Sequence, residues 1–233
     1  MRYFMIFVFC FCVLSLSPIS HAQTTEQAAP AVQQDVPNVN FEWAFGALIG
    51  TDKQFVSITH DTVLNSTEEI KMMVKLNKDC YVYLIHYGSQ GEVDLLFPYT
   101  LGQLQSDYSS EKNYYVPKGR NWIVLDKNPG KEIFFLVASS ERLLDLEAKV
   151  GEYLGVTDDA KRKPLADNVV TEIRTIRRHY ASFATLTEKP LTIGGNVRAL
   201  DEKKENHRPD VADFSIAITA KNFYSKTFTI DHK

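Results

Sequence analysis

Residues 67–98 constrain the fold of this chain more than any other stretch, because their apolar residues follow the period of β-strands. In the first part, one alternating set is apolar: Ile70, Met72, Val74 and Leu76. The other set, which we expect to face solvent, is Lys71, Met73, Lys75 and Asn77. Alternation of this kind is typical of a strand with one buried face. The stretch therefore begins with a half-buried strand over residues 70–76.

The rest of this stretch predicts a β-hairpin. Residues 80–87 are apolar on both faces and rich in aromatic and β-branched types, which indicates a central strand covered on both sides. Residues 88–91 include two glycines and form a loop that suits a hairpin. The chain returns over residues 92–97 until Pro98, which ends the strand because it has no backbone N–H to donate. One face of this returning strand carries Val93, Leu95 and Phe97.

Shorter segments with strand periods surround this stretch. They lie at residues 41–48, 55–58, 113–116, 120–126, 131–138 and 214–230. Before the last of these segments, the spacing of the apolar residues becomes helical. A first helix is expected from Leu143. After a polar loop, a second helix is expected with a cap at Asp167 or Asn168 and an apolar stripe from Val169. We therefore expect a mainly β protein, an antiparallel β-sandwich-like domain with a two-helix insertion, at about 140–185, before the C-terminal strand or strands. The end of the chain is expected to form a hairpin or one bent strand.

The N-terminus predicts export. Arg2 precedes a dense apolar run over residues 4–16, and the order Ser20-His21-Ala22 offers small residues at the positions that a signal peptidase reads. We expect a signal peptide over residues 1–22, a flexible linker over 23–40 and a single domain over 41–233. No second apolar run reaches the roughly 18 residues that span a bilayer, so we expect no membrane span after cleavage.

The run DCYVYLIHYGSQGEVDLLFP, residues 79–98, resembles the core of the bacterial family DUF4384. Two further pieces of the resemblance follow in order, Val116-Pro117 and Gly130-Lys131-Glu132. The likeness covers roughly residues 60–140. It implies a β-sandwich-like module in exported bacterial proteins, with the periplasm as the compartment. It implies no catalytic residues.

Known chemical motifs are absent from the sequence. No pair of histidines has zinc-site spacing, and no P-loop, dinucleotide fingerprint or Gly-x-Ser-x-Gly elbow occurs. The formal net charge of −3 argues against nucleic acid as a partner. Cys80 is expected to be a small core residue and His86 to lie at an exposed strand end. We therefore expect no metal, no cofactor and no enzymatic activity.

A long loop over residues 99–113 is the candidate contact surface. Long loops on a rigid sheet often carry binding residues, and a tyrosine ring gives much contact area for little entropy loss. We hypothesise a binding surface made by Tyr99 and Tyr108 with help from Tyr87 and Tyr114. The alternative partner surface is the basic face of the second helix, with Arg174, Arg177 and Arg178.

The sequence thus predicts an exported, non-catalytic binding or accessory module of the bacterial cell envelope, with a protein partner. Two alternatives stay open. One is a subunit of an envelope or secretion assembly. The other is an envelope hydrolase whose site is assembled from distant residues, with His86 and Cys80 as the side chains to test.

Overall fold

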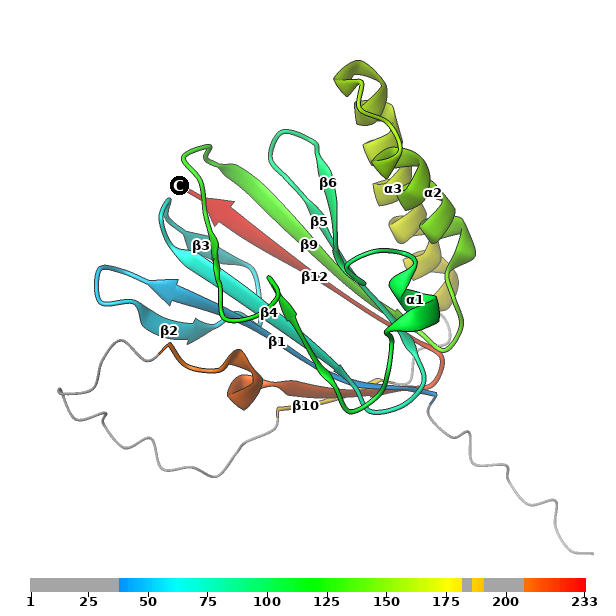
Figure 1. Ribbon diagram of the computed structural model, residues 1–233, viewed down its shortest axis with the longest axis horizontal. Coiled ribbons are helices and arrows are strands. Elements are labelled where there is room, and N and C mark those ends of the chain that lie inside the picture. Colours follow the sequence, from blue (N-terminus) through cyan, green and yellow to red (C-terminus); the bar gives the residue numbers. More distant parts are fainter. Residues whose placement is uncertain (1–37, 182–185, 191–207) are drawn as a thin grey trace, which may run out of the picture. The chain divides into compact units, whose positions relative to one another are not determined.

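The computed structural model of the chain, shown in Figure 1, describes residues 38–181, 186–190 and 208–233. The expected signal peptide over residues 1–22 and the expected linker up to residue 37 lie outside the described residues. The first strand, β1 (Val39–Ile49), begins two residues before the expected boundary of the linker, and Val39 is already fully buried. Its alternating Phe41, Trp43 and Phe45 face the core, as their spacing predicts.

In the described part of the chain, the strands form two sheets. The larger sheet has the order β10 (Leu186–Pro190), β11 (Ile216–Ala220), β1, β4 (Glu69–Leu76), β7 (Asn113–Val116), with β2 (Gln54–Ser57) also on β1 and β8 (Ile123–Val124) also on β4. The smaller sheet has the order β3 (Thr62–Leu64), β12 (Phe223–His232), β9 (Gly130–Ser139), β5 (Tyr81–Tyr87), β6 (Val93–Phe97). All neighbours are antiparallel except β3 and β12. The predicted mainly β, sandwich-like fold is confirmed.

The main core lies between the two sheets and is rich in aromatic rings. Trp43 and Phe45 of β1 meet Phe228 of β12 with ring centroids 5.0 and 5.7 Å apart, and Phe45 also meets Phe134 of β9 at 5.1 Å. These four side chains are at most 3% exposed. Their inward positions follow from strand alternation, so the sheets are joined by the residues that the sequence pattern marks as apolar.

Two helices cover the other face of the smaller sheet (Figure 1). They are α2 (Leu144–Leu154) and α3 (Asp159–Tyr180), and they lie between β9 and the C-terminal strands in the chain, as predicted. The expected cap of the second helix, at Asp167 or Asn168, is wrong by nine or ten residues. Asp158 caps α3 by accepting a hydrogen bond from the backbone N–H of Ala160, so the expected polar loop around Pro164 is helical.

Hydrogen bonds from the hydroxyl groups of two tyrosines connect the helices to the smaller sheet. The Tyr83 hydroxyl of β5 donates to Glu147 Oε1 of α2 at 2.6 Å and accepts the backbone N–H of Leu143 at 3.2 Å. The Tyr153 hydroxyl of α2 accepts the backbone N–H of Val93 at 2.9 Å. Because these groups are buried, each bond also satisfies a donor or acceptor that water cannot reach. The position of the helices on the sheet is therefore specified by polar contacts as well as by apolar packing.

The second face of β4 is buried, so the expectation that it faces solvent is wrong. Met73 on this face is 1% exposed and packs in a small cluster with Trp122 and with Val211 of the 3₁₀ helix η2 (Val211–Phe214). The covering residues come from segments 49 and 138 positions away in the chain, at Trp122 and Val211. The alternation of residues within one strand cannot show that residues so far away in the sequence bury its second face.

Lys71 is a charged residue on this covered face and is 5% exposed. Its ammonium group donates to the backbone oxygens of Pro117, Gly119 and Asn121 at 3.3, 2.8 and 2.6 Å. Burial lowers the pKa of Lys71, because the charged form loses water. The three carbonyl oxygens replace that water, and they hold the loop after β7 against β4.

Three other details differ from expectation. A bulge shifts the register between β5 and β6, so that Phe97 pairs with Leu84 while Leu95 pairs with Ile85. As a result, Phe97 joins the core between the sheets, whereas Val93 faces the helices. Residues 61–66, where no strand was expected, contain β3. The last two strands form neither a hairpin nor one bent strand, because β11 belongs to the larger sheet and β12 to the smaller one.

Candidate functional site

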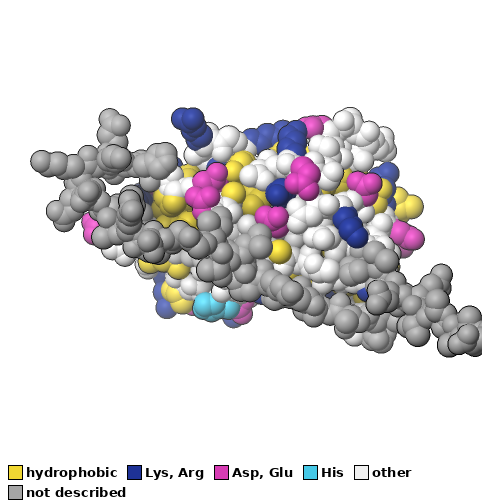
Figure 2. Space-filling view, turned by 90° about the horizontal axis from the view of Figure 1, so that it is seen from below, with side chains coloured by type: hydrophobic (Ala, Val, Ile, Leu, Met, Phe, Trp, Pro, Cys, Tyr) yellow, Lys and Arg dark blue, Asp and Glu magenta, His cyan; other side chains and the backbone are white. Residues whose placement is uncertain are grey.

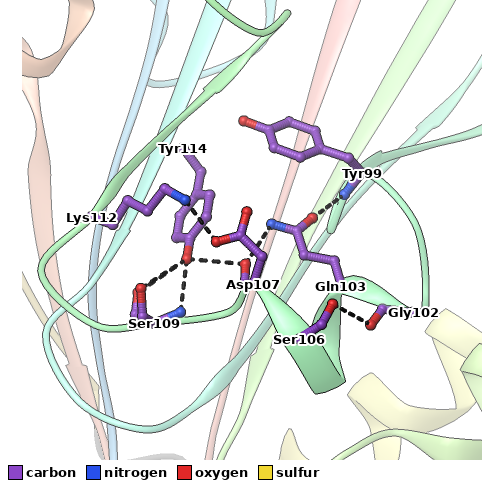
Figure 3. A network of polar contacts seen from close by, with 8 residues as sticks. All are labelled: Tyr99, Gly102, Gln103, Ser106, Asp107, Ser109, Lys112 and Tyr114. Carbon is purple, nitrogen blue, oxygen red and sulfur yellow. Dashed lines mark hydrogen bonds and ion pairs between the residues drawn. The ribbon is translucent and has the colours of Figure 1, made fainter.

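The loop proposed as a contact surface is folded on itself. It contains the short helix α1 (Gln103–Ser106), and Figure 3 shows how polar contacts close the loop around Asp107 and Tyr114. Gln103 is central, because its side-chain oxygen accepts the backbone N–H of Tyr99 at 2.7 Å and its amide donates to the backbone oxygen of Asp107 at 3.1 Å. Lys112 pairs with the Asp107 carboxylate at 2.7 Å. These polar groups of the loop are thus hydrogen-bonded or paired within the loop itself, which is typical of a segment with a structural role.

Tyr114 lies inside this structure and is 1% exposed. Its ring packs on Phe97 at 5.0 Å. Its hydroxyl accepts the backbone N–H of Ser109 at 2.7 Å and donates to backbone oxygens of Asp107 and Ser109 at 3.3 and 3.2 Å. The expectation that Tyr114 is exposed for binding is wrong.

Tyr108 and Tyr99 are partly buried and pack against the main core. The Tyr108 hydroxyl accepts the backbone N–H of Val82 at 2.6 Å and its burial raises its pKa. The Tyr99 hydroxyl donates to the backbone oxygen of Tyr115 at 2.7 Å, and burial raises its pKa to about 12. Both hydroxyls are thus used within the domain. Tyr87 is also partly buried, but on the opposite face of the smaller sheet, against the helices. The four tyrosines do not form one surface.

The basic face of α3 lies beside a groove. Arg174, Arg177 and Arg178 line a cavity of about 770 Å³ together with Tyr180 of the same helix and Phe223 of β12, and we call this the arginine groove. The rings of Tyr180 and Phe223 are stacked, with centroids 4.5 Å apart and planes at 11°. All three arginines are exposed, whereas the aromatic pair is largely buried. The groove therefore has a cationic rim over an aromatic floor.

The arginines differ in how far they are already engaged. Arg177 donates to the Thr227 hydroxyl at 2.9 Å, and Arg178 donates to the Thr175 hydroxyl at 3.3 Å. The Arg174 guanidinium makes no hydrogen bond or ion pair within the described ranges. None of the described residues that line the groove is acidic. Three positive charges therefore share one rim, and no described lining residue supplies a compensating carboxylate.

The surface in Figure 2 has a different character. Figure 2 views the side at the bottom of Figure 1, and the visible described part carries Lys or Arg side chains interspersed with Asp or Glu side chains. Mixed charges of this kind are typical of an ordinary solvated surface. The rim of the arginine groove, where the described charged residues are all positive, is the better candidate for a binding surface.

A second concave site lies at the other end of β12. We call it the His86 cleft. It is a cavity of about 260 Å³ whose lining includes His86 of β5, Asp94 of β6, Glu132 of β9 and His232 of β12. His86 lies between two carboxylates, with Nδ1 3.2 Å from Asp94 and Nε2 2.7 Å from Glu132. Its ring also lies against Phe134, with centroids 4.8 Å apart.

The electrostatics of this cleft depend on His86, whose side chain is 16% exposed. Burial alone lowers its pKa, but the hydrogen bonds and charges of Asp94 and Glu132 outweigh burial and raise the pKa to about 9. The pKa of Asp94 is lowered in turn, chiefly by its hydrogen bond to His86. His86 is therefore an ion-pair residue at neutral pH, and the expectation of an exposed strand end is wrong.

Cys80 and His86 are not brought together. Cys80 is buried, and its Sγ donates to the backbone oxygen of Asn40 at 3.8 Å. Burial raises the pKa of this thiol to about 11, so it stays protonated at neutral pH. Cys80 and His86 are six positions apart along an extended backbone, which corresponds to roughly 20 Å.

Two further findings concern metals and membranes. Over the ranges that the structure describes, no cluster of three or more His, Cys, Asp and Glu side chains could hold a metal ion. No helix in those ranges is both long enough and apolar enough to cross a membrane.

Comparison with known proteins identifies one family. Residues 63–142 match the model of the family described as Domain of unknown function (DUF4384). This segment runs from β3 through β9 and ends just before α2. No curated protein and no solved structure matches the chain. The resemblance expected from residues 79–98 is thus confirmed, and residues 63–142 are similar to the DUF4384 family.

Proposed function

We propose that this protein is an exported, non-catalytic binding module of the bacterial cell envelope, and that it holds an acidic segment of a partner protein in the arginine groove. The observation that carries the proposal is a cavity of about 770 Å³ whose rim bears three arginines and whose described lining contains no acidic residue. A cationic concavity raises the local concentration of anionic partners. Arginine also forms paired hydrogen bonds to carboxylates, which adds specificity.

The spacing of the arginines suits an extended acidic peptide. Arg174 and Arg178 are four residues apart on a helix, so their Cβ atoms are roughly 5–6 Å apart. Alternate side chains of an extended peptide are separated by roughly 7 Å. Two carboxylates at alternate positions of such a peptide can therefore each meet one guanidinium. The stacked rings of Tyr180 and Phe223 offer an apolar contact for the peptide residue that lies between the two carboxylates.

The closed structure of the tyrosine-bearing loop supports the same choice. The loop over residues 99–113 is closed by its own hydrogen bonds, which leaves few donors for a partner. The separation of Cys80 from His86 and the high pKa of the thiol both support a role without nucleophilic catalysis.

The double variant Arg174→Gln/Arg178→Gln is expected to weaken binding of a fluorescent peptide with alternating glutamates about tenfold or more. Arg177 is left intact, because its bond to Thr227 ties α3 to β12. Fluorescence anisotropy at low and high salt measures the effect. The wild-type affinity should fall with salt, since exposed charges are screened.

The matched control is Arg120→Gln/Lys163→Gln, which removes two exposed positive charges outside the groove. This control should bind the peptide within about twofold of the wild type, since it changes only net charge. Equal losses in both double variants would show general electrostatic attraction instead of a groove. Wild-type binding by the arginine variant, or wild-type binding of a peptide with glutamine in place of glutamate, would contradict the proposal.

Export is tested at the N-terminus. We expect the mature chain to begin near Gln23 and to appear in the soluble envelope fraction, because Arg2, the apolar run and Ser20-His21-Ala22 follow the order of a signal peptide. Mass spectrometry of the protein from fractionated cells gives the N-terminal residue. Intact Met1 in the membrane pellet would contradict this expectation.

A further inference from the structure

The strand that borders the arginine groove has an edge without a neighbouring strand over most of its length. β12 pairs with β9 from Phe223 to His232, whereas on its other side it pairs with β3 only over residues 230–232. Within the described ranges, no strand lies beside residues 223–229 on that side. The unpaired backbone groups of such an edge can bind an extended segment of another chain as an added strand.

Hydrogen bonds at the two ends of this edge show which backbone groups point outward. The backbone oxygen of Asn222 accepts the N–H of Ser140, so the even-numbered positions bond toward β9. The N–H of Thr229 donates to Asp61 Oδ1 at 2.8 Å, so an odd-numbered position points the other way. The backbone groups of successive residues in a strand point to opposite sides. The odd-numbered residues of β12 therefore present theirs to the open edge.

Three of these residues lie along the open part of the edge: Phe223, Ser225 and Thr227. No hydrogen bond to or from their outward backbone N–H and C=O groups is present among the described residues. Ser225 and Thr227 are partly exposed, and both Phe223 and Ser225 line the arginine groove. The groove therefore opens onto a row of backbone donors and acceptors as well as onto the arginines.

The side chains of these residues lie on the face of the sheet that α3 covers. The Phe223 ring is stacked on Tyr180, and the Thr227 hydroxyl accepts a hydrogen bond from Arg177. In an added strand, every second side chain would lie on that same face, beside the arginines, at a spacing of roughly 7 Å. The open edge and the arginine rim can therefore bind one peptide together, the edge through its backbone and the rim through its carboxylates.

We propose that the partner's acidic segment binds as an additional β-strand on the open edge of β12. This inference rests on the proposed function, because it takes the acidic segment from there and assigns its conformation. The segment is extended, covers residues 223–227 over roughly 16 Å, and carries acidic residues at alternate positions. An acidic helix does not fit this edge, since its backbone groups already bond within the helix.

Amide hydrogen exchange of the protein with the peptide of alternating glutamates is the first test. At saturating peptide, we expect exchange to slow at least about tenfold at the N–H groups of Ser225 and Thr227, because they gain acceptors. The N–H groups of Tyr224 and Lys226 point toward β9 and serve as controls in the same strand, so their exchange should not change. NMR resolves these amides individually. Binding of the peptide without this alternation in protection would overturn the proposal.

Two peptides with methylated backbone nitrogens give an independent test by fluorescence anisotropy. One is methylated at the glutamates and the other at the residues between them, so both keep every side chain. In an added strand only one of these two sets of N–H groups points toward β12, so one peptide should lose affinity at least about tenfold and the other should not. Loss with the methylated glutamates would indicate an antiparallel added strand, and loss with the other peptide a parallel one.

The outcomes distinguish this inference from the proposed function. If the unmethylated peptide binds and the Arg174→Gln/Arg178→Gln variant weakens it, but both methylated peptides bind within about threefold of it, the groove is a binding site and strand addition is wrong. Equal losses with both methylated peptides would also contradict strand addition. If the unmethylated peptide does not bind, or binds equally well to the arginine variant, the proposed function fails and this inference fails with it.

Discussion

Tyr114→Ala is expected to lower the free energy of unfolding by about 3–5 kcal/mol, the usual cost of truncating a buried aromatic residue. The Tyr114 ring is 1% exposed and contacts the rings of Phe97, Tyr99 and Tyr108 at centroid distances of 5.0, 6.4 and 6.3 Å. Its removal leaves a cavity that Tyr99 and Tyr108 cannot fill without leaving their own hydrogen bonds. Urea denaturation of the protein measures the change.

Tyr114→Phe separates the ring from its hydroxyl. This variant keeps the packing and loses only the contacts with Asp107 and Ser109, which predicts a smaller cost of about 1–2 kcal/mol. Because the Ser109 N–H then lacks its acceptor, the loop should become more accessible to protease while the sheets stay folded. A Tyr114→Ala variant within about 1 kcal/mol of the wild type would return this ring to the candidate binding surface.

The strands of the central stretch were predictable because each has a local period. Residues 80–87 are apolar on both faces, and the structure covers β5 with the second sheet on one side and the helices on the other. The helix pair was predictable for the same reason, since Leu146, Val150 and Tyr153 of α2 repeat at helical spacing. Such patterns depend only on neighbours in sequence.

What could not be predicted depends on partners far away in the chain. The burial of Met73 and Lys71 requires Trp122, Val211 and the loop after β7. The bulge at Leu84 and Ile85 depends on how β6 meets β5, and it moves Phe97 to the other face. The helix start at Asp159 was missed because Lys161, Arg162 and Lys163 before Pro164 are typical of a polar loop.

The two concave sites illustrate the same distinction. The basic stripe of α3 was visible as three arginines at helical spacing, but the groove exists only because Phe223 of β12 lies beside Tyr180. The His86 cleft needs three strands in register, with His86 opposite Asp94 on one side and opposite Phe134 on the other. A histidine in an apolar strand was the only signal in the sequence, and it does not identify its partners.

The boundary of the family match has a structural consequence. Within residues 63–142, β9 pairs along its whole length with β12, and β4 pairs with β1, but β1 and β12 lie outside the match. The matched segment therefore lacks one neighbour of a central strand in each sheet. Unpaired strand edges of this length promote aggregation, so the domain needs the flanking strands to fold as described here.

His86 is expected to make stability depend on pH in the alkaline range. Its pKa rises from the ordinary 6.5 to about 9 in the folded protein, because Asp94 and Glu132 stabilise the imidazolium against the effect of burial. A group with a raised folded pKa contributes stability that is complete below its unfolded pKa and is lost as the pH passes the folded value. The contribution should therefore be complete below about pH 6.5 and should disappear between that pH and about pH 9–10. The shift corresponds to roughly 3 kcal/mol at most.

The measurement compares wild type with His86→Gln by urea denaturation from pH 6 to pH 10. Gln keeps a polar side chain but cannot carry the charge, so the variant should be less stable by up to about 3 kcal/mol at pH 6, and the difference should shrink as pH rises. The other ionisable residues that line the cleft, Glu92, Asp126 and His232, are present in both proteins. His60→Gln changes an exposed histidine and should show a difference that is small at every pH. A His86→Gln difference that stays constant from pH 6 to pH 10 would mean that the imidazolium is not stabilised by its two carboxylates, and that packing against Phe134 accounts for the whole effect of this residue.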